Sequence, residues 1–334
     1  MELPPRTITL EEHVALPSLA GWTELDAYVA VTRAFPKTAV TLTDCSEGRI
    51  AAMNSAQVSL QVLSHIPNIG ISDVAGCRGA NNEMAEAVKK NPHRFAGFAV
   101  LPMTYPEEAA KELERAVTEL GFCGALIDNS LDDMTHYDGE RFWPFWATAE
   151  RLGVPIYLHP KYPPQDVIQS RFAGNYGPGA TSGFASALWG WHENVGLHFL
   201  KLCAAGVFDR FPKLKIILGH MGEMVPFMLD RIERMPFLKS EKNLRKTPRQ
   251  AWADNIWITT SGMFSLEPLA TVLKTTKVER ILYSIDYPFE DISLGPKFIE
   301  ELARSGVVTK EELDMIAYKN AEALLGLEGV LASS

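Results

Sequence analysis

The sequence has few of the features that mark secreted, membrane-spanning or nucleic-acid-binding proteins. Only four cysteines occur among 334 residues, and none forms a Cys-X-X-Cys pair, so no disulfide framework is expected. The net charge of −9 argues against a nucleic-acid partner, which requires a basic face. No signal-like segment is evident, and no stretch approaches the roughly 18 apolar residues of a membrane span. These absences predict a cytoplasmic protein without a membrane partner.

What the chain does have is an ordinary globular composition, with 46% hydrophobic and 22% charged residues. Short β-branched or apolar runs alternate along it with helical stretches, and this alternation indicates parallel strands joined by right-handed crossovers. The predicted strands are residues 7–10, 58–63, 95–101, 124–127, 154–158, 214–218, 256–260 and 280–285. The predicted helices are residues 81–91, 107–120, 141–152, 193–205, 268–275 and 294–304.

Eight such units predict an α/β fold, a single (β/α)8 TIM-type barrel that occupies residues 1–334 as one domain. The alternative is an open doubly wound sheet, which the lack of a Gly-X-Gly-X-X-Gly motif after the first strand disfavours. Residues 14–48, 160–190 and 235–250 interrupt the alternation, and we expect long loops there at the C-terminal face, where barrels build their sites. Residues 309–327 are predicted to form a closing helix pair.

Side chains that bind metals stand at the ends of several predicted strands. Glu11 and His13 follow the first strand, His159 follows the fifth, and Asp286 follows the eighth. In a parallel barrel these positions converge on one face, and residues two apart on a strand share a side, so Glu12 is expected to point away. Two imidazoles and two carboxylates suit one divalent cation. Zn²⁺ is the predicted ion, with Mn²⁺ or Mg²⁺ as alternatives.

Each of these residues also has a purely structural interpretation. His159 alone can be a hydrogen-bonded structural group, and Asp286 alone can cap the following helix. His220 and Glu223, after the sixth strand, can cap a helix or support the ligands from behind. The joint placement at strand ends favours function for the set. The remaining histidines lack this placement and are expected to be structural or exposed: His65, His93, His136, His192 and His198.

Several stretches resemble the amidohydrolase superfamily, and specifically its branch of non-oxidative aromatic acid decarboxylases, which act on γ-resorcylate, 2,3-dihydroxybenzoate, salicylate and 5-carboxyvanillate. The resemblance covers nearly the whole chain in order. The matching stretches are TLEEHVALP (9–17), ELGFCGALIDN (119–129), VPIYLHP (154–160), GVFDRFPKLKIILGHMGE (206–223), DRIERM (230–235), DNIWITTSGMFS (254–265) and ERILYSIDYPFE (279–290).

The resemblance implies roles for individual residues. It implies that His220 and Glu223 form a proton-relay pair, that Arg231 lies near the substrate, and that Trp22 lines the pocket for the aromatic ring. It also implies a homodimer or homotetramer. The end of the fourth strand has no lysine to be carbamylated, which favours one metal ion over two. The residues that match the family's ligand positions are Glu11, His13, His159 and Asp286.

The implied activity is release of CO₂ from a small aromatic hydroxy acid, reversible at high bicarbonate. Protonation of the ring carbon that bears the carboxylate avoids an aryl anion, so the site needs a metal to anchor the substrate and an acid to supply the proton. Asp286 is the predicted acid. The acid itself stays open among 2,3- and 2,6-dihydroxybenzoate, salicylate-type and orsellinate-type compounds. Alternatives are a hydrolase or hydratase of the same superfamily, acting on a lactone, amide or unsaturated diacid, and a non-enzymatic scaffold.

Overall fold

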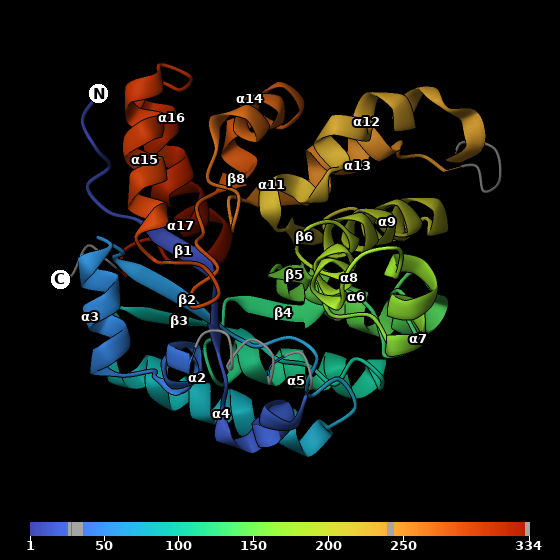
Figure 1. The fold of residues 1–334 in the computed structure, drawn as a ribbon, viewed down its shortest axis with the longest axis horizontal. Coiled ribbons are helices and arrows are strands. Elements are labelled where there is room, and N and C mark those ends of the chain that lie inside the picture. The colour runs from blue at the N-terminus through green and yellow to red at the C-terminus, as the bar shows by residue number, and fades with distance from the viewer. Residues whose placement is uncertain (26–27, 29–35, 239–243, 331–334) are drawn as a thin grey trace.

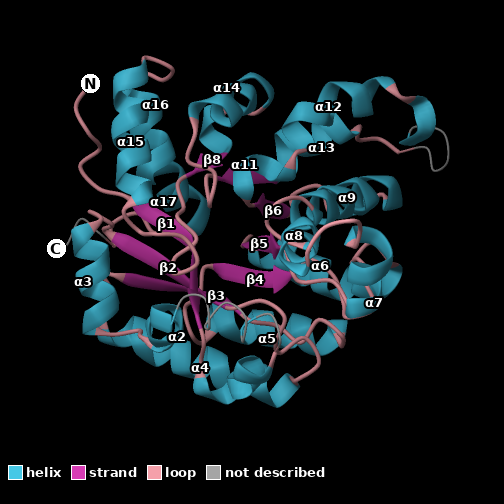
Figure 2. Ribbon diagram, viewed as in Figure 1, coloured by secondary structure: helices cyan, strands magenta, loops and turns pink. Residues whose placement is uncertain are grey.

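In a computed structural model, eight parallel strands form one sheet in chain order, β1 to β8 (Figure 1). The structure describes residues 1–25, 28, 36–238 and 244–330. Helices surround the strands, as Figure 2 shows, which confirms the predicted (β/α)8 barrel. The strands are β1 (Ile8–Val14), β2 (Leu60–His65), β3 (Phe95–Ala99), β4 (Gly124–Asp128), β5 (Pro155–His159), β6 (Lys215–Leu218), β7 (Ile256–Thr259) and β8 (Ile281–Leu282).

The predicted helices are all present, with shifted boundaries, and further helices lie in the segments predicted as loops. Parts of two predicted loops, 26–27, 29–35 and 239–243, lie outside the described residues. Among the helices of the described residues, none is long and apolar enough to cross a membrane. The main α-helices are α2 (Pro36–Thr43), α3 (Glu47–Ser55), α4 (Val74–Lys90), α5 (Pro106–Thr118), α6 (Trp143–Leu152), α8 (Pro178–Ala185), α9 (Gly190–Ala205), α12 (Val225–Arg234), α13 (Pro248–Asn255), α14 (Leu266–Thr275) and α15 (Leu294–Ser305).

The C-terminal segment forms one continuous helical run rather than the predicted pair. A π-helical turn, Met315–Lys319, joins α16 (Lys310–Asp314) to α17 (Asn320–Leu325), and the backbone stays helical at both junctions. Within this run Ile316 accepts a backbone hydrogen bond of 3.0 Å from Tyr283, at the end of β8. Farther along, Ala321 and Leu325 join the cluster inside the barrel with Ile8 and Leu60, the first residues of β1 and β2. The last helix therefore closes the end of the barrel opposite the strand termini that carry the site.

Alternation along the strands separates two apolar regions. On β5, Ile156 and Leu158 pack in the large core between strands and helices. Tyr157, between them, lies in a smaller cluster inside the barrel, together with Leu10 and Ile217. A side chain two residues beyond Tyr157 therefore also faces the interior, and that position is His159.

The contact between β1 and β8 depends on side chains. The Ser284 hydroxyl accepts hydrogen bonds from the backbone N–H of Leu10 (3.1 Å) and Glu11 (2.8 Å). The Glu12 carboxylate accepts from Ile285 N (3.1 Å). These acceptors occupy N–H groups that a regular ladder would use, which explains why β8 has only two residues where six were predicted, 280–285.

Glu12 points away from the four predicted ligands, as the alternation predicted. Its second oxygen accepts a hydrogen bond of 3.0 Å from the Gln61 amide, and the side chain is fully buried. Burial raises the pKa of Glu12 to about 8. The residue is therefore part of the seam between the first and last strands.

We expect Glu12→Ala to lower the free energy of unfolding by roughly 2–4 kcal/mol, because two buried donors, Ile285 N and the Gln61 amide, lose their acceptor. Urea denaturation followed by circular dichroism measures this. The control is Glu300→Ala, whose side chain is 43% exposed and whose effect should stay below about 0.5 kcal/mol. Equal stability of the two variants would refute the role of Glu12.

Candidate metal centre

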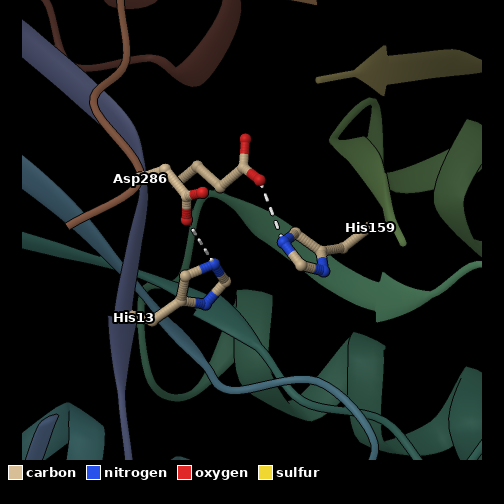
Figure 3. Close-up of side chains that lie close together, drawn as sticks. His13, His159 and Asp286 are labelled. Atoms are coloured by element: carbon tan, nitrogen blue, oxygen red, sulfur yellow. Dashed lines mark ion pairs between the residues drawn. The ribbon is translucent and has the colours of Figure 1, made fainter. Parts of the chain in front are cut away.

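Four side chains from β1, β5 and the segment after β8 meet at the carboxyl end of the barrel, where Figure 3 shows His13, His159 and Asp286 turned toward one another. His159 Nε2 lies 2.9 Å from Glu11 Oε1, and His13 Nε2 lies 3.3 Å from Asp286 Oδ1. One ligand atom from each of the four residues lies within 4.8 Å of the others. The structure thus brings together the residues predicted from the strand ends: Glu11, His13, His159 and Asp286.

Both imidazoles are oriented by a contact at their other nitrogen. His159 Nδ1 lies 2.7 Å from the carbonyl oxygen of Pro160, which can only accept, so Nδ1 carries the proton. His13 Nδ1 lies 3.4 Å from the Ser64 hydroxyl. The Nε2 lone pair of His159 is therefore directed at the centre, which is the usual arrangement for histidines that bind a metal.

The donor set fits a divalent cation. Three buried polar atoms in it have no hydrogen-bond partner: Glu11 Oε1, His13 Nε2 and Asp286 Oδ1. Unpartnered buried polar atoms are rare, and three within one small cluster indicate a missing positive charge. Two carboxyl groups and two imidazoles provide the donors that zinc and manganese accept.

The two carboxyl groups have opposite electrostatic surroundings. Burial alone would raise the pKa of Glu11, but the imidazoles of His220 and His159 outweigh it and hold the pKa well below its usual range. Burial, reinforced by the charge of Glu11, holds the pKa of Asp286 well above its usual range. Two neighbouring carboxyls with pKa values driven apart are typical of acid and base partners.

Tyr157 holds the second oxygen of Glu11. Its hydroxyl donates to Glu11 Oε2 and lies 2.8 Å from the Thr259 hydroxyl. The sequence interpretation did not include Tyr157. Its position two residues before His159 on the same strand is the signal that was available.

His220 stands between Glu11 and Glu223. Its Nδ1 lies 2.7 Å from Glu223 Oε1, and its Nε2 lies 3.8 Å from Glu11 Oε1. The other oxygen of Glu223 lies 2.7 Å from His192 Nδ1. His192 was expected to be structural or exposed, because it follows no strand; it lies at the start of α9.

The backbone that carries His220 and Glu223 is unusual. Residues 220–224, labelled α11 over His220–Glu223, all have positive φ. Such a left-handed conformation costs about 1–2 kcal/mol for each residue that is not glycine. At Gly222, where φ is 86°, an added Cβ would come within 2.9 Å of both Pro226 and Trp252. The tight turn sets His220 and Glu223 side by side.

Two residues named by the resemblance lie farther from the four. Trp22 is buried in the 3-10 turn Pro17–Glu24, and its ring meets Tyr28 edge to face, 5.9 Å apart. Tyr28 lies 6.2 Å from the ring of Phe289, which lies 5.2 Å from His13, so Trp22 belongs to an aromatic wall beside the centre. Arg231 is exposed on α12, and no ion pair joins its side chain to the described residues.

The fourth strand, β4, ends in Asp128, and as expected no lysine stands at this position. Asp128 accepts a hydrogen bond of 2.9 Å from Asn68 N. Burial raises its pKa to about 6. The buried ammonium of Lys161 lies 3.9 Å from Asp128 and donates to Asp132 at 2.6 Å. Lys161 therefore pairs with carboxylates at the rim of the barrel and lies outside the cluster of four.

The remaining histidines make structural contacts. His65 accepts from Leu16 N at 3.4 Å, and its Nδ1 lies 3.0 Å from its neighbour's carbonyl, so it ties the ends of β1 and β2. His136 and His198 stack at 4.7 Å, and His198 accepts from Tyr137 N. His93 contacts the carbonyl of Val330 at the surface. These four agree with the sequence interpretation.

Comparisons with known proteins agree with this geometry. A family model described as "Amidohydrolase" matches residues 71–327. "Decarboxylase orsB" of Emericella nidulans is 47% identical over 325 residues, covering 96% of this chain and 97% of the relative. "Gamma-resorcylate decarboxylase" of Polaromonas sp. is 35% identical and covers 96% of this chain and 98% of the relative. A crystal structure of a dihydroxybenzoic acid decarboxylase from Polaromonas, with bound manganese and 2-nitroresorcinol, superposes with a TM-score of 0.85 at 33% identity, covering 97% of each chain.

We expect the purified chain to bind one equivalent of divalent metal. His159→Ala should weaken that binding by more than about 10- to 100-fold, because loss of a residue that only orients a metal ligand already weakens binding by that much. Chelation should lower the melting temperature, because the ion binds only the folded state. Plasma emission spectrometry after dialysis and differential scanning calorimetry measure both. His93→Ala is the matched control at the surface. Unchanged metal content in His159→Ala would contradict the site.

Proposed function

The chain belongs to the amidohydrolase family, and we propose that it is a metal-dependent, non-oxidative decarboxylase of an ortho-hydroxylated aromatic acid. The observation that carries the proposal is the cluster of Glu11, His13, His159 and Asp286, in which burial and the charge of Glu11 hold the pKa of Asp286 well above its usual range. A hydrolytic site needs a base, whereas a decarboxylating site needs a proton donor. Decarboxylase orsB and the γ-resorcylate decarboxylases of Polaromonas and Rhodococcus each cover 96% of this chain.

The proposed metal ligands are Glu11, His13, His159 and Asp286. A divalent ion bound there would act as a Lewis acid toward the carboxylate and the ortho oxygen of the substrate. Zn²⁺ is the predicted ion. Mn²⁺, which the Polaromonas neighbour holds, accepts the same donors. Tyr157 holds the Glu11 carboxylate and Ser284 holds its backbone, so Glu11 is positioned without help from the ion.

The reaction consumes one proton for each CO₂ released. Asp286 gives that proton to the ring carbon that bears the carboxylate, the bond from the ring to the carboxyl carbon breaks, and its electron pair restores the aromatic ring. Burial and the charge of Glu11 raise the pKa of Asp286, which favours its protonated form between turnovers. His220, whose pKa the charges of Glu223 and Glu11 raise to about 10 against the effect of burial, is the group that we propose returns a proton to Asp286.

The sequence-based expectations of a cytoplasmic homodimer or homotetramer, with Trp22 and Arg231 near the substrate, belong to the same proposal. Trp22 is placed to support the pocket wall through Tyr28 and Phe289. Arg231 is exposed, so a role for it depends on chain assembly or on a movement of α12. Light scattering of the purified protein measures the assembly.

We expect Asp286→Asn to keep the fold while lowering kcat for decarboxylation by about 10²- to 10⁴-fold, the usual contribution of a general acid. The amide is the same size but has no acidic proton. Initial rates of CO₂ release, with metal content measured on the same sample, test this. Near-normal turnover in Asp286→Asn would remove Asp286 from the role of acid.

A panel of hydroxybenzoic acids with CO₂ detection should identify a substrate with a hydroxyl ortho to the carboxylate. The same enzyme in concentrated labelled bicarbonate should carboxylate the matching phenol, because the reaction is close to thermoneutral there. Ring opening or hydration of a lactone, amide or unsaturated diacid without CO₂ would instead support the hydrolase or hydratase alternative. Unlabelled product in bicarbonate would count against reversibility.

A further inference from the structure

We propose that His192 is a positioning residue of this site, which fixes the Glu223 carboxylate by donating a hydrogen bond from Nδ1 and thereby holds the His220 ring against Glu11. The inference rests on the proposed decarboxylase function and assigns a role to a histidine outside the four ligands. It starts from the contacts of Glu223. The side chain of Glu223 is completely buried, and each of its two oxygens lies 2.7 Å from an imidazole Nδ1, one of His220 and one of His192.

The proton positions follow from the partners. An ionised carboxylate can only accept, so both Nδ1 atoms carry hydrogens and donate to Glu223. The pKa of Glu223 agrees, because His220 and His192 outweigh burial and lower it to about 2. His192 is held in turn by a second contact, since its Nε2 lies 2.8 Å from the carbonyl oxygen of Ala187. His192 is therefore a fixed donor rather than a mobile surface side chain.

The backbone turn sets where Glu223 lies but does not fix its carboxylate, so hydrogen bonds must hold the side chain. Glu223 lies in the left-handed turn, where His220, Met221 and Met224 also have positive φ. The turn packs directly on α9, since an added Cβ at Gly196 would come within 2.8 Å of the Glu223 carbonyl oxygen. His192, on the same helix, provides the hydrogen bond from α9 to the Glu223 side chain.

Loss of this hydrogen bond would free one oxygen of Glu223, and the carboxylate could then rotate away from His220. His220 Nε2 is 3.8 Å from Glu11 Oε1, so a small rotation of the ring changes its distance to the centre. The expected effect is on the rate of proton delivery rather than on substrate or metal binding, because His192 contacts none of the four ligands.

A second cation bound by His192, His220 and Glu223 is the other interpretation of this group, since their ligand atoms lie within 4.8 Å of one another. The hydrogen bonds argue against it. No atom of these three residues is among the buried polar atoms that lack a partner in the described residues, whereas three atoms of the other cluster are. Both oxygens of Glu223 and both ring nitrogens of His192 have hydrogen-bond partners within the protein.

The test compares three substitutions at His192 in the metal-loaded enzyme. Asparagine places an amide donor where Nδ1 lies, glutamine places it nearer to Nε2, and leucine provides none. We expect His192→Leu and His192→Gln to lower kcat by roughly 10- to 100-fold, the range for residues that orient a ligand, with KM and bound metal within about twofold. His192→Asn should stay within about threefold of wild type. His93→Gln is the surface control.

A spectroscopic measurement accompanies the kinetics. In ¹H–¹⁵N spectra of the histidine rings, His192→Leu should shift the Nδ1–H signal of His220 and leave those of His13 and His159 in place, and His192→Asn should restore the His220 signal. The proposal is overturned if His192→Leu keeps kcat and the His220 signal, if His192→Asn is as impaired as His192→Leu, or if the variants lose one of two bound metal equivalents. Absence of CO₂ release by the wild type from every acid refutes the proposed function instead, and the ring spectra still test His192.

Discussion

The seam between the first and last strands is the contact on which the rest of the structure depends. Ser284 and Glu12 replace the ladder hydrogen bonds there with side-chain acceptors, and His13 N donates to the carbonyl of Tyr287 at 2.7 Å. This join fixes Glu11 and Asp286 beside each other although they are far apart in the chain. Without it the barrel would be an open sheet, and two of the four ligand residues would lie at opposite edges.

Once the seam is closed, electrostatics determines what the site can do. Two carboxyls cannot both ionise easily in a buried space without a cation. The imidazoles of His220 and His159 lie near Glu11 and lower its pKa, whereas burial and the charge of Glu11 raise the pKa of Asp286. The cluster that could hold a divalent ion therefore also contains one carboxyl group with a raised pKa, as the proposed proton donor requires.

The sequence predicted the parts of this arrangement that repeat with the period of a strand. Glu11 and His13 lie two apart, and His159 and Asp286 end other strands, so their convergence followed from a parallel barrel. The length of β8 was overestimated, because apolar residues 280–285 look like a strand while their N–H groups bond elsewhere. The role of His192 was missed, because it reaches Glu223 from the start of α9, just after the predicted loop 160–190 and not at the end of a strand.

The left-handed turn at residues 220–224 could not be predicted from the sequence either. The segment after Gly219 contains one further glycine, Gly222, and nothing in its composition indicates that the four neighbours of Gly222 adopt positive φ. That conformation follows from packing against Pro226, Trp252 and α9, which lie later or earlier in the chain. Local propensity favours other conformations at these positions, and tertiary contacts override it.

The order of synthesis gives the seam a further consequence. Three residues of the cluster, Glu11, His13 and His159, are synthesised well before Asp286, and the helical run 310–325 follows later still. During translation β1 has no partner on one side, and its buried Glu12 has no contact with Ile285. The complete set of four donors therefore exists only after Asp286 has been made, so the proposed metal site can form no earlier than that.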